Sequence, residues 1–407
     1  MGIEHWLLLV GSILVLSIVG AKVTSKLGIP VLIFFVAIGM IGGSDGPGNV
    51  WFTDANLAKN VGTLALAFIL FAGGMELEWG SAKPHVGKAM ALSTFGVLLT
   101  AGIVGAAAFY FLNLPILEGL LLGSIIASTD AAAVFGTLSR GEAKLRHSIR
   151  DMLEMESGSN DPIAIFLTIF LIQAVKGTAP GMATGALHFV WEMVLGALGG
   201  WVIGRLGVIA MRKLHLDHEG MFHVVSIAAV LISFGGVAAM KGNGFLAVYI
   251  AGVTLGNGQF RQRRGLRRFH DGIAWLMQIL LFVTLGLLVF PSQLVHVIGA
   301  GTLISFVLMF VARPIAVHLS LMPFRVPVRE QAFIAWCGLR GAVPIVLATY
   351  PLIADVPRAQ EYFNIVFYVV MFSALLQGTT IPFVAKRLKL YEAPPQSETQ
   401  RELTMFP

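Results

Sequence analysis

The sequence predicts an all-α polytopic membrane protein with about 13 transmembrane helices, arranged as two inverted six-helix repeats. Three observations predict this fold class: an apolar composition, apolar runs of spanning length along nearly the whole chain, and similarities between the two halves at a near-constant interval. Of the 407 residues, 56% are apolar and 12% are charged, and the mean hydropathy is +0.81. An ordinary soluble domain carries about 25% charged residues, so this composition indicates many apolar spans instead of one large water-soluble core.

The spans are predicted from apolar runs, because a membrane helix needs about 20 mostly apolar residues to cross the hydrocarbon layer. Such runs lie near residues 3–24, 29–43, 57–75, 86–112, 115–138, 152–175, 184–211, 221–240, 244–257, 272–290, 293–319, 330–352 and 362–385. The second and ninth runs are short and interrupted by glycine.

Orientation is predicted from the lysine and arginine residues between the runs. One alternate set of loops carries most of them: Lys22, Lys26, Lys83, Lys88, Arg140, Lys144, Arg146, Arg150, Arg212, Lys213, Arg261, Arg263, Arg264, Arg267, Arg268, Arg325, Arg329, Lys386, Arg387 and Lys389. The opposite loops carry only Lys59, Lys176, Lys241 and Arg358. Since Lys-rich and Arg-rich loops stay in the cytoplasm, we expect a cell inner-membrane protein with its N-terminus outside and its C-terminus in the cytoplasm. The same distribution accounts for the net charge of +6 by membrane anchoring, so no nucleic-acid partner is expected.

Weak internal similarities relate the two halves of the chain. Ile38–Gly43 resembles Ala251–Gly256 at an interval of 213 positions, and Ser128–Asp130 and Leu339–Gly341 stand 211 apart. Seven spans separate the starts of the two halves, and because seven is odd, the repeats would be inverted in the membrane. This plan is common among secondary transporters, whose sites lie at the midplane where broken helices meet.

The domain prediction follows from these intervals. We expect a transmembrane domain over residues 1–390, followed by a polar cytoplasmic tail at 391–407. Within the transmembrane domain, repeat one is predicted at about 3–175, a linker helix at 184–211 and repeat two at about 221–388.

Ionisable residues inside the predicted spans are candidates for function, because a charge there costs several kcal/mol. Two of them, Asp130 and Arg340, lie in stretches that predict a helix break, the first beside Thr129 in a polar triplet and the second among glycines and a proline. Carbonyls freed by such a break can ligate a cation, while Asp130 can face positive half-helix N-termini and Arg340 negative C-termini. The alternative is a pair of unbroken helices that Asp130 and Arg340 join by a plain salt bridge.

The sixth predicted span carries the main candidate site. At about 100° per residue, Glu156, Asn160, Ser157 and Asp161 fall on one polar face of a helix. Hard monovalent cations prefer oxygen ligands, and a carboxylate that also takes a proton makes the two ions compete for one place. Asp161 is therefore the predicted carrier of cation and proton, provided that burial brings its protonation near working pH. The alternative is that Ser157 and Asp161 cap a helix N-terminus.

Glu156 has a different predicted role, because a second titrating carboxylate would disturb this competition. Arg313, in the eleventh predicted span, is the candidate partner for a permanent ion pair with Glu156. The alternative is that the Arg313 side chain snorkels to the membrane surface.

Three motifs resemble those of the NhaP-type monovalent cation:proton antiporters, and within them the bacterial potassium/proton branch. They are Glu156–Pro162 with the following Ile163–Thr168, Ser128–Phe135, and Gly338–Ile345, and the resemblance covers roughly residues 3–390. It implies an NhaA-like fold and a homodimer with a mobile ion domain. It also implies electroneutral exchange of K⁺, or of Na⁺, for H⁺ in pH homeostasis, with no cofactor.

The resemblance also implies residue roles. Asp161 would be the shared carboxylate and Asn160 its structural neighbour, while Ser157 and the Thr129 backbone would ligate the ion. Glu156 with Arg313 would form a stabilising pair, and Asp130 and Arg340 would compensate the half-helix ends. Members of this branch usually carry a nucleotide-sensing cytoplasmic domain after the last span, so residues 391–407 are expected to be a linker toward a domain that this sequence lacks.

Two other function classes compete with cation:proton antiport. The first is a passive cation channel or a non-exchanging uptake carrier. A channel needs a selectivity filter, which the sequence does not show, and the single carboxylate beside an amide favours exchange. An intramembrane enzyme is not expected, because the predicted spans contain no Ser–His pair and no His-Glu-x-x-His run. The single cysteine, Cys337, excludes an internal disulfide and a Cys-based metal site.

Overall fold

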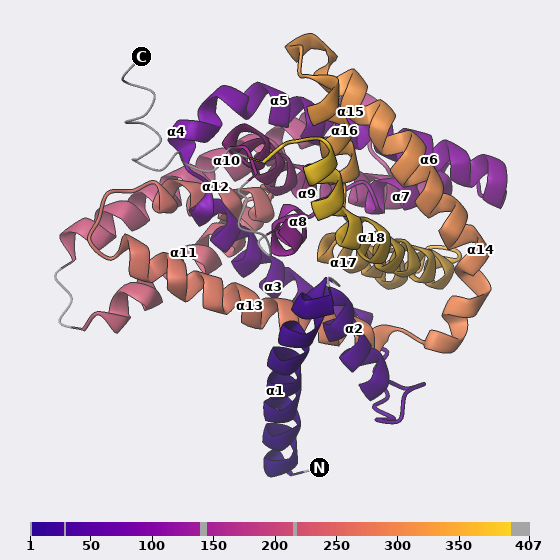
Figure 1. The fold of residues 1–407 in the computed structure, drawn as a ribbon, viewed down its shortest axis with the longest axis horizontal. Helices are drawn as coiled ribbons and strands as arrows, with labels where there is room; N and C mark the ends of the chain where they lie inside the picture. The colour runs from indigo at the N-terminus through magenta and orange to yellow at the C-terminus, as the bar shows by residue number, and fades with distance from the viewer. Residues whose placement is uncertain (1, 28–29, 139–144, 215–217, 392–407) are drawn as a thin grey trace, which may run out of the picture.

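The chain is almost wholly helical. The computed structural model describes residues 2–27, 30–138, 145–214 and 218–391 (Figure 1). In these residues the one β contact is an isolated antiparallel bridge between Leu145 and Tyr391. The predicted polar tail after Tyr391 lies outside the described residues, as does the part of the basic loop that holds Arg140 and Lys144.

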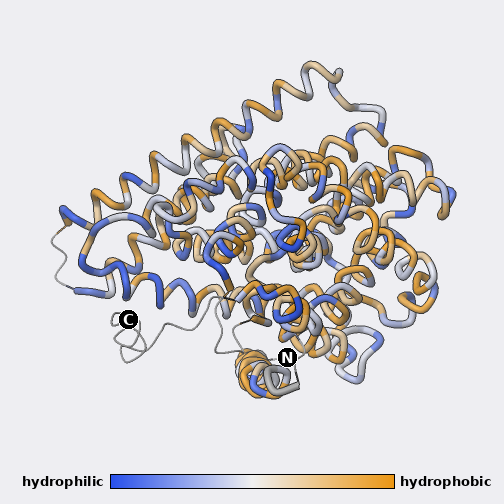
Figure 2. The backbone as a smooth tube through the Cα atoms, turned by 45° about the horizontal axis from the view of Figure 1, so that its top comes forward, coloured by the Kyte–Doolittle hydropathy of each residue, from blue (hydrophilic) through white to orange (hydrophobic). Residues whose placement is uncertain are grey.

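Nine helical stretches of the described residues are long and apolar enough to cross a membrane. They are α1 (Ile3–Leu27), α3 (Ala55–Glu76), the run from α4 (Trp79–Ala82) through α5 (Val86–Ala91) to α6 (Val97–Leu112), α9 (His147–Val175), α10 (Met182–Lys213), α11 (Gly220–Ala239), α13 (Arg263–Leu288), the run from α14 (Pro291–Val307) through α15 (Arg313–Leu321) to η4 (Met322–Phe324), and α18 (Ala359–Arg387). Apolar colour prevails along the helices in Figure 2, and hydrophilic stretches lie at the edges of the bundle and at a few places inside it. The prediction of an all-helical protein with many apolar spans is confirmed.

Shorter apolar helices make up the remaining segments. They are α2 (Val31–Gly42), α7 (Ile116–Ile125), α12 (Gly244–Gly256) and α17 (Ala342–Ile353). Two of them belong to interrupted segments, since α8 (Ala131–Leu138) follows α7 and α17 follows α16 (Val328–Trp336). The alternative of unbroken helices at these two places is therefore wrong.

Helix α9 lies at the centre of the bundle, together with α8 and α17 (Figure 1). Glycines allow the helices around it to pack backbone against backbone. A Cβ atom at Gly252 of α12 would lie 2.4 Å from the carbonyl oxygen of Phe71 in α3, and one at Gly158 of α9 would lie 2.3 Å from the Tyr249 ring of α12. Small residues at such contacts let helices approach closely within a membrane, and here they bring α12 against both α3 and α9.

Two π-helical turns interrupt the long composite runs. The first, η2 (Leu92–Gly96), lies between α5 and α6, and the second, η3 (Leu308–Ala312), lies between α14 and α15. They begin 216 positions apart, at Leu92 and Leu308. A π turn inserts a residue into the helical repeat and often lies near a functional group. The second turn ends immediately before Arg313.

Candidate functional site

The two helix breaks cross and bind each other at the centre of the molecule. The Asp130 amide donates a hydrogen bond to the Leu339 carbonyl at 2.8 Å. The Arg340 guanidinium donates through Nη1 to the carbonyls of Ala127 at 2.9 Å and Ser128 at 2.6 Å. Polar backbone groups that an unwound helix exposes must find partners inside a membrane protein, and each break supplies partners to the other.

The two charged residues of the breaks bind half-helix ends. Asp130 Oδ1 accepts a hydrogen bond at 3.0 Å from the amide of Ala133, in the first turn of α8. Arg340 is completely buried and points its Nη1 at carbonyls that follow the end of α7. Each charge thus lies at the helix end of opposite polarity. The carboxylate and the guanidinium bind backbone groups instead of forming the plain salt bridge of the alternative prediction.

Gly341 makes room for the Asp130 carboxylate. A Cβ atom at Gly341 would lie 1.8 Å from Asp130 Oδ2, which is far inside any permitted contact. Only glycine fits at this position while Asp130 keeps its place. Sequence reasoning used Gly341 as a helix breaker and missed this second requirement, which depends on how closely the two breaks approach.

Asp161 lies in the middle of α9 and contacts the first break. It is 4% exposed, and the Ser128 hydroxyl donates a hydrogen bond to its Oδ1. Because α9 runs from His147 to Val175, Asp161 does not cap a helix N-terminus. Pro162 follows it inside the helix and has no N–H, so the carbonyl of Gly158 loses its intrahelical partner next to the site.

Ser157 and Asn160 contact the same break. Ser157 Oγ donates to the Thr129 carbonyl at 2.9 Å and accepts from the Ala131 amide at 3.2 Å. Asn160 Nδ2 donates to Thr129 Oγ1 at 2.6 Å, while its Oδ1 is buried without a hydrogen-bond partner among the described residues. A buried oxygen without a donor calls for an explanation, and a cation ligand is one.

Glu156 and Arg313 form a buried ion pair between α9 and α15. Arg313 Nη2 lies 2.6 Å from Glu156 Oε1, and the two side chains are 3% and 1% exposed. Arg313 therefore does not snorkel to a membrane surface. The structure separates the polar face of α9 into two groups: Glu156 points to Arg313, whereas Ser157, Asn160 and Asp161 point to the first break.

Ser128 is a contact of Asp161 that sequence reasoning missed. It was part of the polar triplet, but no role was assigned to it. Its hydroxyl contacts Asp161 while its carbonyl accepts from Arg340 Nη1 at 2.6 Å. The signal was a third polar residue in an apolar span, and its partner could not be read without the placement of α9 against the break.

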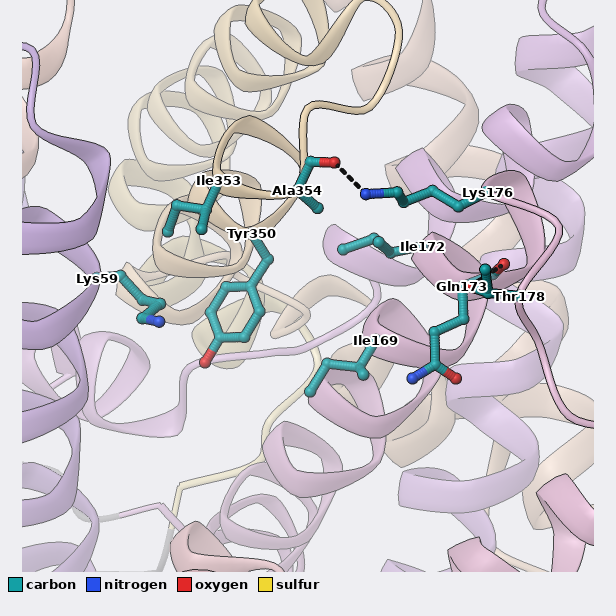
Figure 3. A pocket seen from close by; sticks show the side chains of 9 residues that line it. All are labelled: Lys59, Ile169, Ile172, Gln173, Lys176, Thr178, Tyr350, Ile353 and Ala354. Carbon is teal, nitrogen blue, oxygen red and sulfur yellow. Dashed lines mark hydrogen bonds between the residues drawn. The ribbon is translucent and has the colours of Figure 1, made fainter.

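A cavity of about 430 Å³ lies along the C-terminal half of α9 and does not include Asp161 in its lining (Figure 3). Its lining residues come from α3, from α9 and its following turn, and from α17: Lys59, Ile169, Ile172, Gln173, Lys176, Thr178, Tyr350, Ile353 and Ala354. Lys59 lies 5.8 Å from the Tyr350 ring centre, and Lys176 Nζ donates to the Ala354 carbonyl at 2.9 Å. Two lysines oppose cation binding in this cavity, so the candidate cation site remains the one around Asp161.

The part of the chain that the structure describes contains no group of three or more His, Cys, Asp or Glu residues arranged to hold a metal ion. The polar groups around Asp161 are of another kind: one carboxylate with hydroxyl, amide and backbone oxygens. Such a set suits a weakly bound, exchangeable cation better than a permanently held metal.

Residues 13–387 match the family of transmembrane sodium/hydrogen exchangers. The chain belongs to this exchanger family. The match covers both crossed breaks and all of α9, and it agrees with the resemblance that the three motifs indicated.

Relatives of this exchanger-family chain include proteins named as antiporters. The chain is 41% identical over 391 residues to the "K(+)/H(+) antiporter NhaP" of Alkalimonas amylolytica, which covers 96% of this chain and 68% of the relative. It is 40% identical to the "K(+)/H(+) antiporter NhaP2" of Shewanella oneidensis, with 95% and 68% covered. It is 28% identical to the "Na(+)/H(+) antiporter 1" of Methanocaldococcus jannaschii, with 83% and 81% covered.

The fold of this exchanger-family chain is shared with a solved structure. The sodium proton antiporter MjNhaP1 of Methanocaldococcus jannaschii superposes with a TM-score of 0.76 at 24% sequence identity, covering 94% of this chain and 99% of that one. At this identity the comparison shows a common fold.

Proposed function

We propose that this protein exchanges a monovalent cation for H⁺ across a cell inner membrane by letting both ions compete for Asp161. The observation that carries the proposal is the buried Asp161 carboxylate in contact with a crossed helix break, beside the unpartnered Asn160 Oδ1, in a chain of the exchanger family. An empty, charged carboxylate is costly to carry through a closed state, whereas the cation-loaded and the protonated forms are both neutral. Exchange is then obligatory and electroneutral.

The proposed cation ligands are Asp161, Ser157, Thr129 and Asn160. The Ser157 hydroxyl and the Thr129 carbonyl are joined by a 2.9 Å hydrogen bond, so the hydroxyl hydrogen must turn away when both oxygens bind a cation. Asn160 Oδ1 needs no such change, because it has no donor to release among the described residues. Protonation of Asp161 removes the negative charge that attracts the cation.

The remaining charges hold this ligand set in place in our proposal. The Glu156–Arg313 pair fixes α9 against α15 at 2.6 Å. Asp130 and Arg340 neutralise half-helix ends and link the two breaks. None of these four residues needs to change its charge during exchange.

We infer that the chain forms 13 spans in two inverted repeats within a transmembrane domain at 1–390. The near-constant spacing of the π turns, 216 positions apart, and of the breaks, Ser128–Asp130 and Leu339–Gly341, 211 positions apart, supports this layout. We also propose that the N-terminus faces outward and that the protein is a homodimer. Lys and Arg in alternate loops support the orientation, and exposed apolar residues such as Leu8 and Leu198, at 71% and 56%, support a lipid or partner contact.

We propose K⁺ as the preferred cation, because relatives about 40% identical are named as K⁺/H⁺ antiporters. The more distant relative named as a Na⁺/H⁺ antiporter keeps Na⁺ as the alternative cation. A passive channel is the competing class, and it would move the cation without a proton.

The test is proton movement in proteoliposomes that contain a pH-sensitive dye. We expect a pulse of K⁺ to drive protons in the opposite direction, without dependence on membrane potential, and Na⁺ to be weaker. Asp161→Asn removes the titrating group at nearly constant size and should abolish exchange. If K⁺ or Na⁺ moves without protons, or if Asp161→Asn keeps full exchange, the proposal is wrong.

A further inference from the structure

Helix α18 carries two buried polar side chains that the site described above does not use. Ser373 is 0% exposed and Gln377 is 1% exposed, although α18 is among the longest apolar helices. A polar side chain buried in a span is costly unless it has partners. Both of these side chains find their partners at the second helix break.

The contacts of Ser373 and Gln377 link α18 to both sides of that break. Ser373 Oγ accepts from the Arg340 amide at 3.2 Å and donates to Gln377 Oε1 at 2.6 Å. Gln377 Nε2 donates to the carbonyl of Trp336, the last residue of α16, at 3.0 Å. The last carbonyls of a helix have no intrahelical partner, so the amide satisfies one of them. The Gln377 amide accepts from Ser373 and donates to Trp336 at once, whereas an ionised carboxylate at this position could only accept.

These contacts continue to Asp161 through two residues. Arg340 Nη1 donates to the Ser128 carbonyl at 2.6 Å, and the Ser128 hydroxyl donates to Asp161 Oδ1. Displacing Arg340 therefore displaces the hydroxyl that orients the proposed cation ligand.

A serine followed four positions later by a polar side chain lies at each break. Ser157 and Asp161 are such a pair on α9, and Ser373 and Gln377 are such a pair on α18, although the two helices begin 212 positions apart and the two pairs are 216 apart. In the first half of the chain, the serine binds the first break and the residue four positions later is the carboxylate. In the second half, the serine binds the second break and the residue four positions later is an amide.

We propose that Ser373 and Gln377 are positioning residues, which hold the second break so that Arg340 and Ser128 keep the Asp161 site in its cation-binding form. The inference rests on the proposed exchange function and names two further residues that set its cation affinity.

The test compares variants by the cation concentration that gives half-maximal proton flux in proteoliposomes. Ser373→Ala and Gln377→Met each remove some of the hydrogen bonds that join α18 to the second break. We expect each variant to raise the half-maximal cation concentration by about threefold to tenfold, the effect of about one buried hydrogen bond. The maximal rate should change by less than about twofold. Ser373→Thr keeps the hydroxyl and should restore affinity close to that of the unmodified protein.

Thr379→Ala is the matched control on the same helix. Thr379 is exposed, and its hydroxyl donates only within α18, to the Leu375 carbonyl at 2.6 Å and the Leu376 carbonyl at 3.3 Å. This variant should keep the half-saturating concentration unchanged. If Ser373→Ala does not fold, Gln377→Glu, which keeps the size and removes the donor, carries the same expectation.

Two results would overturn the inference. One is an unchanged half-saturating concentration in the Ser373 and Gln377 variants, and the other is a loss of maximal rate alone, in proportion to the amount of folded protein. If the unmodified protein and Thr379→Ala show no proton-coupled flux, the proposed function fails instead. The inference is then tested by the rise in unfolding temperature that KCl or NaCl causes relative to choline chloride, because this rise requires cation binding but no exchange. An equal rise in the unmodified protein and in all variants would contradict the inference.

Discussion

Glu156 and Asp161 are carboxylates of one helix with different partners. Glu156 lies 2.6 Å from Arg313 and is 1% exposed, whereas Asp161 accepts a hydrogen bond from the neutral Ser128 hydroxyl. A buried carboxylate and guanidinium in contact are far more stable together than either charge alone. In our proposal, Asp161, which lies among hydroxyl and amide groups, is the carboxylate that exchanges a proton for a cation. At the scale of single residues, the contacting side chains therefore distinguish Glu156, as a member of an ion pair, from Asp161, as the candidate ion-binding carboxylate.

The buried pair gives the first prediction. Glu156→Gln or Arg313→Met leaves one buried charge without its partner, so each should lower the free energy of unfolding by about 3–5 kcal/mol. The double variant leaves no unpaired charge, so its loss of unfolding free energy should be smaller than the sum of the two single losses. Thermal unfolding of the purified protein in detergent measures all three.

The control for this prediction is the pair of Arg150 and Glu154, which lies on the same helix at 2.9 Å but with Arg150 45% exposed. Removing that pair should change stability by about 1 kcal/mol or less. Strictly additive losses for Glu156 and Arg313 would contradict the interpretation of them as a buried pair.

At the scale of elements, the crossing of two interrupted helices builds the site. Each break exposes backbone groups that the other break satisfies, through the Asp130 amide and the Arg340 guanidinium. The closeness of the crossing depends on Gly341, where a side chain would collide with Asp130. The two breaks are therefore one structural unit.

Gly341→Ala tests this unit. The added methyl group must displace the Asp130 carboxylate, because its Cβ would lie 1.8 Å from Oδ2. We expect a loss of at least about tenfold in exchange rate and a lower unfolding temperature. Gly102→Ala is the control, since a Cβ there meets nothing within 4 Å and alanine favours a helix over glycine. Equal exchange rates and unfolding temperatures in the two variants would show that the crossing has space for a methyl group at position 341, contrary to the structure.

Local signals in the sequence predicted both breaks, because glycine, proline and a polar triplet interrupt a helix wherever they lie. They also made Asp161 the main candidate for the site, since a carboxylate in an apolar span is costly without a role. The contact of Ser128 with Asp161 and the fit of Gly341 around Asp130 could not be predicted. Both depend on the placement of segments far apart in the chain, and that placement is determined by packing.

At the scale of the whole molecule, the two halves of the chain share a similar order of helical elements but place different side chains at their helix breaks. Both halves have a π turn in a long composite helix and a break in a later one. The first break meets a carboxylate from α9, and an amide from α18 donates to the Trp336 carbonyl, where the second break begins. Breaks from both halves meet beside Asp161, and this arrangement supports our proposal of alternating access to that residue.

The central claim is that cation and proton compete for Asp161, and the dependence of cation affinity on pH tests it most directly. Initial exchange rates are measured in proteoliposomes over a range of K⁺ or Na⁺ concentrations at several pH values. Competition predicts that lowering the pH raises the half-saturating cation concentration, by up to about tenfold per pH unit, while the maximal rate at saturating cation stays constant. A half-saturating concentration that does not change with pH, together with a maximal rate that falls, would contradict competition for one carboxylate.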